Sequence, residues 1–388
     1  MEQQTQKSNT IATGLAMFSM FFGAGNVVFP LALGQYAQDQ NLYAILGLLI
    51  SAVGVPFLGL IAMTLFNGNY KHFFERIGVV PGFLVSAAIM GLIGPFGAIP
   101  RCITLSFATL KIYSPDLSLP VFSILSCLII LLLTIRPGKI LDILGYVLTP
   151  ILIGSLAIII VKGIITSPAA PHADHSSFAI FWKGLTEGYQ TMDLLGAFFF
   201  SYVVLACLER NIDTKNPKNY RRVIWLALKA SGIGAFLLAL SYMGFSYVAA
   251  FNSEALAHVP KDELAGTVAN IVLGPYAGVV ACIAVSMACL TTAIALSAVF
   301  AEFVHKDLTA NKLNYEISLV ITLIVSFFVS TLHFTGIAAF LQPILQICYP
   351  ALIVLSIVNI AHKLYHFQPV KVPVFGTFIL SAIGYYFL

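Results

Sequence analysis

The chain has 388 residues, of which 59% are hydrophobic and only 9% are charged, and its formal net charge is +4. Soluble domains average about 25% charged residues, and no soluble core could bury this much apolar surface. Together with a mean hydropathy of +0.94, these values exclude a soluble protein and predict a bilayer as the solvent.

Eleven apolar stretches are long enough to cross a bilayer, because a helical span needs about 20 predominantly apolar residues. No segment between them is long enough to form a separate domain, so we expect an all-α polytopic protein with a single transmembrane domain over residues 1–388. In chain order, the expected spans cover residues 11–36, 42–66, 83–111, 118–136, 141–166, 184–208, 222–251, 266–303, 315–333, 337–362 and 372–388.

The distribution of lysine and arginine predicts the orientation of these spans. With a cytoplasmic N-terminus, fourteen of the 20 basic residues fall on the cytoplasmic side and four on the outer side. The loop ERNIDTKNPKNYRR (209–222) contributes the largest share. The N-terminus lacks the basic region and cleavage site of a signal peptide, and the six cysteines do not have metal-ligand spacing. We therefore expect a cytoplasmic N-terminus, no removable signal peptide and no zinc site.

This orientation places the sequence PHADH, with His172 and His175, in an outer loop. Two interpretations stay open there. A surface metal site would use both histidines and the aspartate between them, whereas a solvated loop would leave all three without a ligand. The second interpretation is favoured, because a flexible loop holds metal ligands in no fixed geometry.

The first span carries its own interruption, in the sequence FSMFFGAGNVVFP (18–30). Gly23, Gly25 and Asn26 cluster there, and Pro30 follows. In hydrocarbon an unpaired backbone group costs several kcal/mol, so irregular backbone is expected only where it is buried in protein or lines a cavity. Glycines that merely let helices pack closely are the alternative, but close packing does not account for Asn26.

Two stretches 180 residues apart resemble each other: IGPFGAIPRC (93–102) in span three and LGPYAGVVAC (273–282) in span eight. Chance is one explanation, because glycine and proline are common in membrane helices. The other is a repeat of five spans, 11–166 against 184–363, with 372–388 as an accessory helix. Because five is odd, such a repeat is inverted, as in many secondary transporters, whose sites lie between the repeats.

An inverted repeat predicts a second interruption in span six, and LTEGYQTMDLLGAFFF supplies one between Gly188 and Gly196. Freed amides at the start of a half-helix suit a carboxylate, and freed carbonyls at the end of another half-helix suit a hard cation such as Na⁺. A zwitterionic amino acid is complementary to such a pair of helix ends.

Three further polar positions within the spans are candidates for a role. Asp193 lies in span six, where a carboxylate costs about 2.5–3.5 kcal/mol, and it could bind a substrate ammonium, carry a proton or pair with a cation. For Arg101 the alternatives are a structural ion pair with Asp193, an outer gate and an anchor for a carboxylate. In span eight, Thr291 and Thr292 could share a hard cation with the Ala288 carbonyl, although such threonines more often bond to their own helix.

The stretches MFFGAGNVVFP, IGPFGAIPR and GYQTMDLLGAFFFSYVV resemble the bacterial branched-chain amino acid–cation symporter family, and the resemblance covers essentially the whole chain. That family belongs to the amino acid–polyamine–organocation superfamily and has the leucine-transporter-type fold. The resemblance implies a five-plus-five inverted repeat with unwound spans one and six, in the bacterial cytoplasmic (inner) membrane. It also implies uptake of leucine, isoleucine and valine coupled to Na⁺ or H⁺, with no other cofactor and no nucleic-acid partner.

The resemblance further implies roles for individual residues. Span one would hold the substrate carboxylate and span six would line the other side, which gives a substrate site of Gly23, Ala24, Gly25, Asn26, Tyr189, Gln190, Thr191, Met192 and Asp193. The cation would lie between span-one carbonyls and span-eight oxygens, at Ser19, Phe22, Ala288, Thr291 and Thr292. Arg101 and Asp193 would form a gate.

Two features depart from the family pattern. Family members usually have twelve spans, whereas eleven are counted here, so we expect that a final helix is either absent or truncated. The run PRCITLSFATL, which starts at Pro100, is less polar than the family pattern implies. This second departure affects the expected substrate preference rather than transport itself.

Two other classes of function fit the sequence less well. A channel needs a pore lined by polar rings, and no such motif repeats here. An intramembrane enzyme needs a nucleophile with a base, or a set of metal ligands, and the sequence contains neither H-E-x-x-H nor G-x-S-x-G. The sequence therefore predicts a secondary active transporter and not an enzyme, with another neutral amino acid or a small amine as the alternative substrate.

Overall fold

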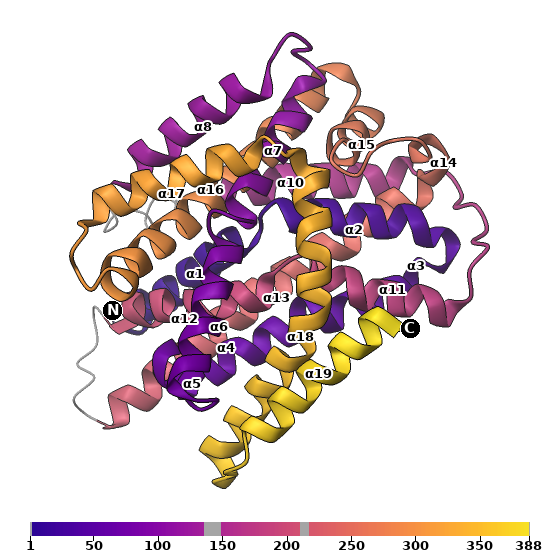
Figure 1. Ribbon diagram of the computed structural model, residues 1–388. Helices are drawn as coiled ribbons and strands as arrows, with labels where there is room; N and C mark the ends of the chain where they lie inside the picture. The colour runs from indigo at the N-terminus through magenta and orange to yellow at the C-terminus, as the bar shows by residue number, and fades with distance from the viewer. Residues whose placement is uncertain (1, 136–148, 210–216, 388) are drawn as a thin grey trace.

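The computed structural model describes every residue except 1, 136–148, 210–216 and 388. In this part of the chain the regular structure is helical throughout (Figure 1). Five of the described helical stretches are long and apolar enough, by length and composition, to cross a membrane, and shorter apolar helices accompany them. A helix pairs its own backbone polar groups, so an apolar chain in hydrocarbon folds as helices.

The first half of the chain follows predicted spans one to five. The start of span five, at residue 141, lies outside the described residues, as does the middle of the basic loop 209–222, residues 210–216. The helices of this half are α1 (Glu2–Phe21), α2 (Ala24–Ala37), η1 (Gln38–Gln40), α3 (Asn41–Leu49), η2 (Ile50–Gly54), α4 (Val55–Leu65), α5 (Tyr70–Glu75), α6 (Val79–Ile93), α7 (Ala98–Lys111), α8 (Leu119–Thr134) and α10 (Thr149–Thr166).

The second half begins with a broken span six and ends with a helix that lies along α18 at the edge of the bundle (Figure 1). Its helices are α11 (Ser177–Tyr189), α12 (Asp193–Glu209), α13 (Pro217–Phe251), α14 (Ser253–Leu256), α15 (Leu264–Leu273), α16 (Pro275–Phe303), η5 (Val304–Leu308), α17 (Tyr315–Ser330), α18 (His333–Tyr365) and α19 (Lys371–Phe387).

Span eight begins later than predicted. The expected stretch 266–303 is divided at Gly274, which separates the short helix α15 from α16. Gly274 has a φ of +82°, in the left-handed region, and Pro275 has no N–H with which to continue a helix. The prediction of one helix from residue 266 was wrong because hydropathy does not distinguish a ten-residue apolar helix from the start of a span.

Both copies of the Gly-Pro-aromatic motif lie at helix junctions. Gly94 ends α6, with its N–H donated to the Met90 carbonyl (2.8 Å), and α7 begins at Ala98. Gly274 likewise ends α15 by donating to the Asn270 carbonyl (2.8 Å). The two glycines share this helix-ending hydrogen bond but differ in conformation, with φ −90° at Gly94 and +82° at Gly274, and the boundaries of the inverted repeat stay a prediction.

The two broken spans occupy the centre of the bundle. In helices α2 and α12, the described residues next to the breaks are buried. On one side, α13 packs against α1 and α2, α4 packs against α12, and α3 packs against α11. On the other side, α16 packs against α7, α8 and α17. The outer surface carries exposed apolar side chains, among them Leu132 and Phe328, as expected for a surface in contact with lipid.

Glycine lets helices of the first group approach to backbone contact. A Cβ on Gly184 of α11 would lie 2.2 Å from the Ala44 carbonyl oxygen of α3, and one on Gly47 would lie 2.2 Å from the Phe181 oxygen. A Cβ on Gly34 of α2 would lie 2.0 Å from the Ser246 oxygen of α13. These approaches hold α11, the first half of span six, and α2 of span one against their neighbours.

We predict that Gly184→Ala lowers the thermal unfolding midpoint of the detergent-purified protein, because overpacking against backbone costs about 1–3 kcal/mol. The matched control is Gly232→Ala in α13, where a Cβ would meet nothing within 4 Å. That control is expected to unfold at or above the wild-type midpoint. Equal midpoints for the two variants would show that α3 and α11 can separate without cost.

Candidate functional site

The interruptions of spans one and six meet at the centre of the bundle. Span one is non-helical only at Phe22 and Gly23. Span six is non-helical only at Gln190, Thr191 and Met192. A Cβ on Gly25 would lie 3.1 Å from both the Gln190 oxygen and the Thr191 Cα. The first turn of α2 therefore lies directly against the break in span six, and a side chain on Gly25 would separate them.

The predicted extent of unwinding in span one was too long. Ala24, Gly25 and Asn26 form the first turn of α2 and are not unwound. Gly23 precedes them in extended conformation, with φ −119° and ψ −159°. The amides of a first helical turn have no partner within their own helix, so this turn still presents donors at the positive end of the α2 dipole.

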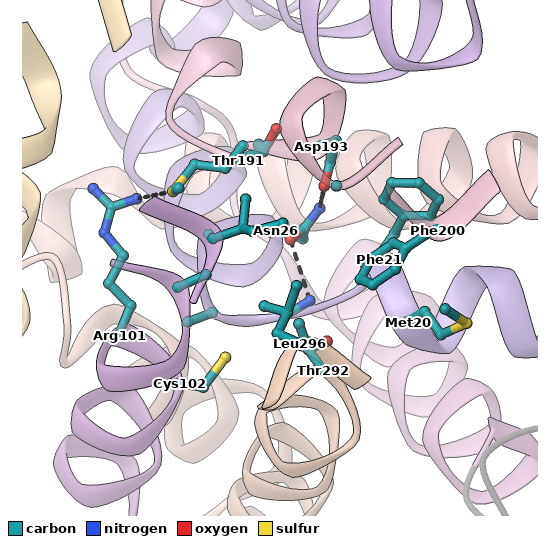
Figure 2. A pocket seen from close by; sticks show the side chains of 17 residues that line it. Met20, Phe21, Asn26, Arg101, Cys102, Thr191, Asp193, Phe200, Thr292 and Leu296 are labelled. Carbon is teal, nitrogen blue, oxygen red and sulfur yellow. Dashed lines mark hydrogen bonds between the residues drawn. The ribbon is translucent and has the colours of Figure 1, made fainter. Parts of the chain in front are cut away.

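A cavity of about 40 Å³ lies where the two breaks meet (Figure 2). Seven of the nine predicted substrate residues line it, and Tyr189 and Gln190 do not. Its wall also contains apolar side chains that the sequence analysis did not identify individually, among them Met20, Phe21, Phe200 and Leu296. The predicted residues that line the cavity are Gly23, Ala24, Gly25, Asn26, Thr191, Met192 and Asp193.

Asp193 is buried, with 3% of its surface exposed, and it is held by neutral donors. The Asn26 amide donates to both carboxylate oxygens (2.9 and 2.8 Å), and the Tyr242 hydroxyl donates to Oδ2 (2.7 Å). Asn26 in turn accepts the Gly23 N–H through its side-chain oxygen (3.2 Å). Asn26 therefore connects the break in span one to the carboxylate that follows the break in span six.

Tyr242 was missed by the sequence analysis. It lies in α13, in the apolar run LLALSYMGF, and is fully buried. A tyrosine in the middle of a span needs a hydrogen-bond partner for its hydroxyl, and this was the only local signal. Its partner is 49 positions away in the chain, so the pairing follows from the packing of α13 against the broken helices.

The alternative of an ion pair between Arg101 and Asp193 was wrong. Arg101 instead donates from Nη1 to the Gln190 carbonyl (3.0 Å) and from Nη2 to the Gln190 side-chain oxygen (3.0 Å). Figure 2 shows Arg101 and Asp193 on different sides of Asn26. The two charges belong to different sides of the break: Arg101 binds its first residue, and Asp193 begins the helix that follows it.

The predicted cation residues come together beside the break in span one. The Thr291 hydroxyl donates to the Ala288 carbonyl (2.8 Å) and lies 3.2 Å from the Ser19 carbonyl oxygen. The Thr292 hydroxyl lies 3.3 Å from the same Ser19 oxygen. A Cβ on Gly23, the residue after Phe22, would lie 2.9 Å from Thr292 Cγ2. The Ser19 carbonyl of span one, the Ala288 carbonyl and two span-eight hydroxyls thus form one oxygen-rich cluster.

The loop with His172 and His175 is docked, contrary to the expectation of a flexible loop. Asp39 of η1 accepts the Ala173 N–H (2.9 Å) and bonds to His172 Nδ1 (2.7 Å). The His175 ring stacks on Tyr36, with centroids 4.6 Å apart. Among the described residues, no group of three or more His, Cys, Asp and Glu side chains could hold a metal ion. The loop that precedes span six is therefore attached to the end of span one at the protein surface.

The match to known families is extensive. The family model described as "Branched-chain amino acid transport protein" matches residues 6–385. The chain belongs to this family. It is 32% identical over 377 residues to the branched-chain amino acid permease BrnQ of Bacillus subtilis, which covers 94% of this chain and 84% of that protein. BraB of the same organism is 30% identical over 381 residues, with 94% and 82% covered. Membership makes the chain a multi-pass membrane transporter and not an enzyme.

Solved structures show the same fold. Mhp1, a nucleobase-cation-symport-1 family transporter, aligns with a TM-score of 0.65 at 11% identity, over 97% of this chain and 91% of that one. MhsT in complex with L-phenylalanine aligns with a TM-score of 0.59 at 13% identity, over 96% and 98%. At these identities the likeness concerns the fold alone, which is the leucine-transporter-type bundle predicted from the sequence.

Docking of the loop that contains His172 is expected to depend on pH. The Ala173 N–H and the His172 ring hold the pKa of Asp39 below its ordinary 3.8, and the hydrogen bond and charge of Asp39 raise the pKa of His172 above 6.5. A raised histidine pKa stabilises the fold below its ordinary pKa and loses this effect as the pH rises through the folded-state value. A lowered aspartate pKa stabilises the fold above the ordinary aspartate pKa, and this effect is lost as the pH falls through the folded-state value. The contact is therefore strongest between the ordinary pKa of aspartate and that of histidine.

We predict that His172→Gln lowers the thermal unfolding midpoint more at about pH 5.5 than at about pH 8.5, by a small amount because exposed ion pairs contribute little. The control is His175→Gln, which removes a histidine that stacks on Tyr36 and does not bond to Asp39. A His172→Gln deficit that is the same at both pH values would contradict an ionic contact.

Proposed function

We propose that the protein imports branched-chain amino acids by secondary active transport coupled to Na⁺ or H⁺. The observation that carries the proposal is the meeting of two interrupted spans around one cavity, with Asp193 on its wall. Relatives named as branched-chain amino acid permeases support the substrate class. The residues of the cavity provide a separate physical argument for it.

The two polar groups of an amino acid match two different features of the cavity. Its carboxylate would bind at the first turn of α2, where Ala24 and Gly25 present amides at the positive end of the helix dipole. Its ammonium would bind Asp193, a carboxylate that accepts hydrogen bonds from the neutral Asn26 and Tyr242. An ammonium would supply the positive charge that this buried carboxylate lacks.

The apolar wall suits a branched aliphatic side chain. Phe21 and Phe200 pack edge to face, with centroids 5.2 Å apart, and Met20 and Leu296 line the same cavity. An apolar pocket separates substrates by only about 1–3 kcal/mol per methylene. Leucine, isoleucine and valine should therefore compete for one site, with valine the weaker ligand.

The coupling ion would be a co-substrate held by the oxygen cluster of Ser19, Ala288, Thr291 and Thr292. Carbonyl and hydroxyl oxygens are the ligands that hard cations prefer. The cluster fits this role because the Ser19 hydroxyl is buried without a hydrogen-bond partner and two threonine hydroxyls point at one carbonyl. If a proton couples instead, Asp193 is the group that would carry it.

Transport would follow alternating access in the cytoplasmic membrane, with the N-terminus inside. The group containing α1 to α4 and α11 to α13 would rock against α7, α8, α16 and α17. The substrate would bind between the groups, because the cavity is lined by residues of α2, α7, α12 and α16. Rocking would open the cavity to each side in turn.

We predict that purified protein in proteoliposomes accumulates radiolabelled leucine above its external concentration when a Na⁺ or a pH gradient is imposed. Imposing the gradients separately identifies the coupling ion, and excess unlabelled isoleucine or valine should reduce the uptake. Accumulation under neither gradient would remove the symporter proposal, and flux that only equilibrates leucine would indicate a passive channel.

For sodium-driven uptake, we predict that Thr292→Ala raises the Na⁺ concentration for half-maximal activation by about tenfold or more, which corresponds to about 1.4 kcal/mol. The control is Thr322→Ala in α17, a buried threonine whose hydroxyl donates to the Ser318 carbonyl of its own helix (2.7 Å). Unchanged sodium activation in Thr292→Ala would move the cation away from the oxygen cluster.

A further inference from the structure

Arg101 is a buried charge without a counter-ion. It lies in the first turn of α7 and is 2% exposed. No carboxylate of the described residues lies within ion-pair distance of its guanidinium. Glu187, on helix α11 before the break in span six, is already paired with Lys183 (3.0 Å) and Lys261 (3.5 Å). A buried charge in a membrane protein is expected to have a partner of opposite sign.

The groups that contact Arg101 are all neutral. They are the carbonyl and side-chain oxygens of Gln190, the sulfur of Met192 at 3.6 Å, and the rings of Phe29 and Phe334, whose centroids lie 5.4 and 5.7 Å from the guanidinium carbon. Such contacts satisfy hydrogen-bond donors of Arg101, and their dipoles and ring electrons attract the cation. They leave its net charge uncancelled.

The side chain of Gln190 is held at one end only. Its oxygen accepts from Arg101 Nη2, while its amide nitrogen is buried without a hydrogen-bond partner. Arg101 Nε is likewise buried and unpartnered. The contact between the two side chains therefore leaves donors unused on both, and a carboxylate could replace the Gln190 oxygen with two acceptors and a negative charge.

The position of Arg101 connects this unpaired charge to the substrate. Arg101 lines the same cavity as Ala24 and Gly25, whose amides face the proposed carboxylate, while Asp193 lines it on another side of Asn26 (Figure 2). The cavity thus carries one unpaired positive and one unpaired negative group that do not neutralise each other. A zwitterion is the class of ligand that would neutralise both.

We propose that Arg101 binds the substrate carboxylate together with the first turn of α2, and that Gln190 occupies the guanidinium until the substrate arrives. The inference rests on the proposed function and names the residue that makes this site select a free carboxylate. Arginine suits this role because its planar fork matches the two oxygens of a carboxylate. Amino alcohols and amines of the same shape would leave the guanidinium unpaired and would bind weakly.

The test is competition against radiolabelled leucine binding to the purified full-length protein. The competitors are L-leucine and L-leucinol, in which a hydroxymethyl group replaces the carboxylate. Wild type is expected to favour leucine by about 100-fold or more, and R101Q to reduce that ratio at least tenfold by weakening leucine and not leucinol. The control is K111Q, which removes an exposed positive charge from the same helix and should keep the wild-type ratio.

Two further variants keep the result interpretable if R101Q does not fold. R101K keeps the charge and loses the fork, so its ratio should fall less than that of R101Q. Q190A frees the guanidinium, so leucine should bind as tightly as in wild type or more tightly, whereas a purely structural clamp would lose thermal stability and leucine binding together.

The outcomes separate this inference from the proposed function. A wild-type protein that separates leucine from leucinol, with R101Q or R101K separating them equally well, contradicts the role of Arg101 alone. Loss of leucine binding in Q190A also contradicts it. A wild type that binds neither compound contradicts the proposed function and the inference together.

Discussion

The constraint on which the rest of this structure depends is that interrupted backbone in hydrocarbon must find partners inside the protein. Spans one and six each lose helical pairing over two or three residues, and each break lies against the other, with Gly25 in contact with the backbone of Gln190 and Thr191. Unpaired backbone groups cost several kcal/mol in such surroundings. The remaining helices surround the breaks, and a site for polar ligands arises at the point that lipid cannot reach.

The buried charges combine structural and functional roles. Asn26 accepts the Gly23 N–H and donates to Asp193, so it stabilises one break while orienting the carboxylate after the other. Arg101 binds the Gln190 carbonyl in the span-six break. Because neutral groups hold each charge, neither charge is neutralised, and a substrate group of opposite charge could pair with it. Under the proposed function, binding and conformational change would thereby be coupled, since the contacts that hold the breaks are the contacts that a ligand would replace.

Several features of the site were predictable from local sequence because lipid makes polar residues conspicuous. The glycine–asparagine cluster at Gly23 to Asn26 and the polar break before Asp193 stand out against apolar helices, and the threonine pair in span eight indicated oxygen ligands for a cation. Other features were not predictable in this way. The direction of Arg101 depends on which side of the span-six break faces α7, and Tyr242 joins the site only because α13 packs against the broken spans. The division at Gly274 was missed because hydropathy averages over a turn.

Composition and polar interruptions alone were therefore enough to indicate a helical membrane transporter with two broken spans, because the cost of polar backbone and charge in lipid is a local property of each segment. Tertiary packing decided which polar groups meet. It excluded the alternative of an Arg101–Asp193 ion pair by placing the two charges in separate clusters, brought Ser19 to Thr291 and Thr292 across 272 and 273 positions, and docked His172 on Asp39. Partners this far apart in the chain are chosen by how helices pack, and that choice is made by glycine contacts and side-chain shape across the whole bundle.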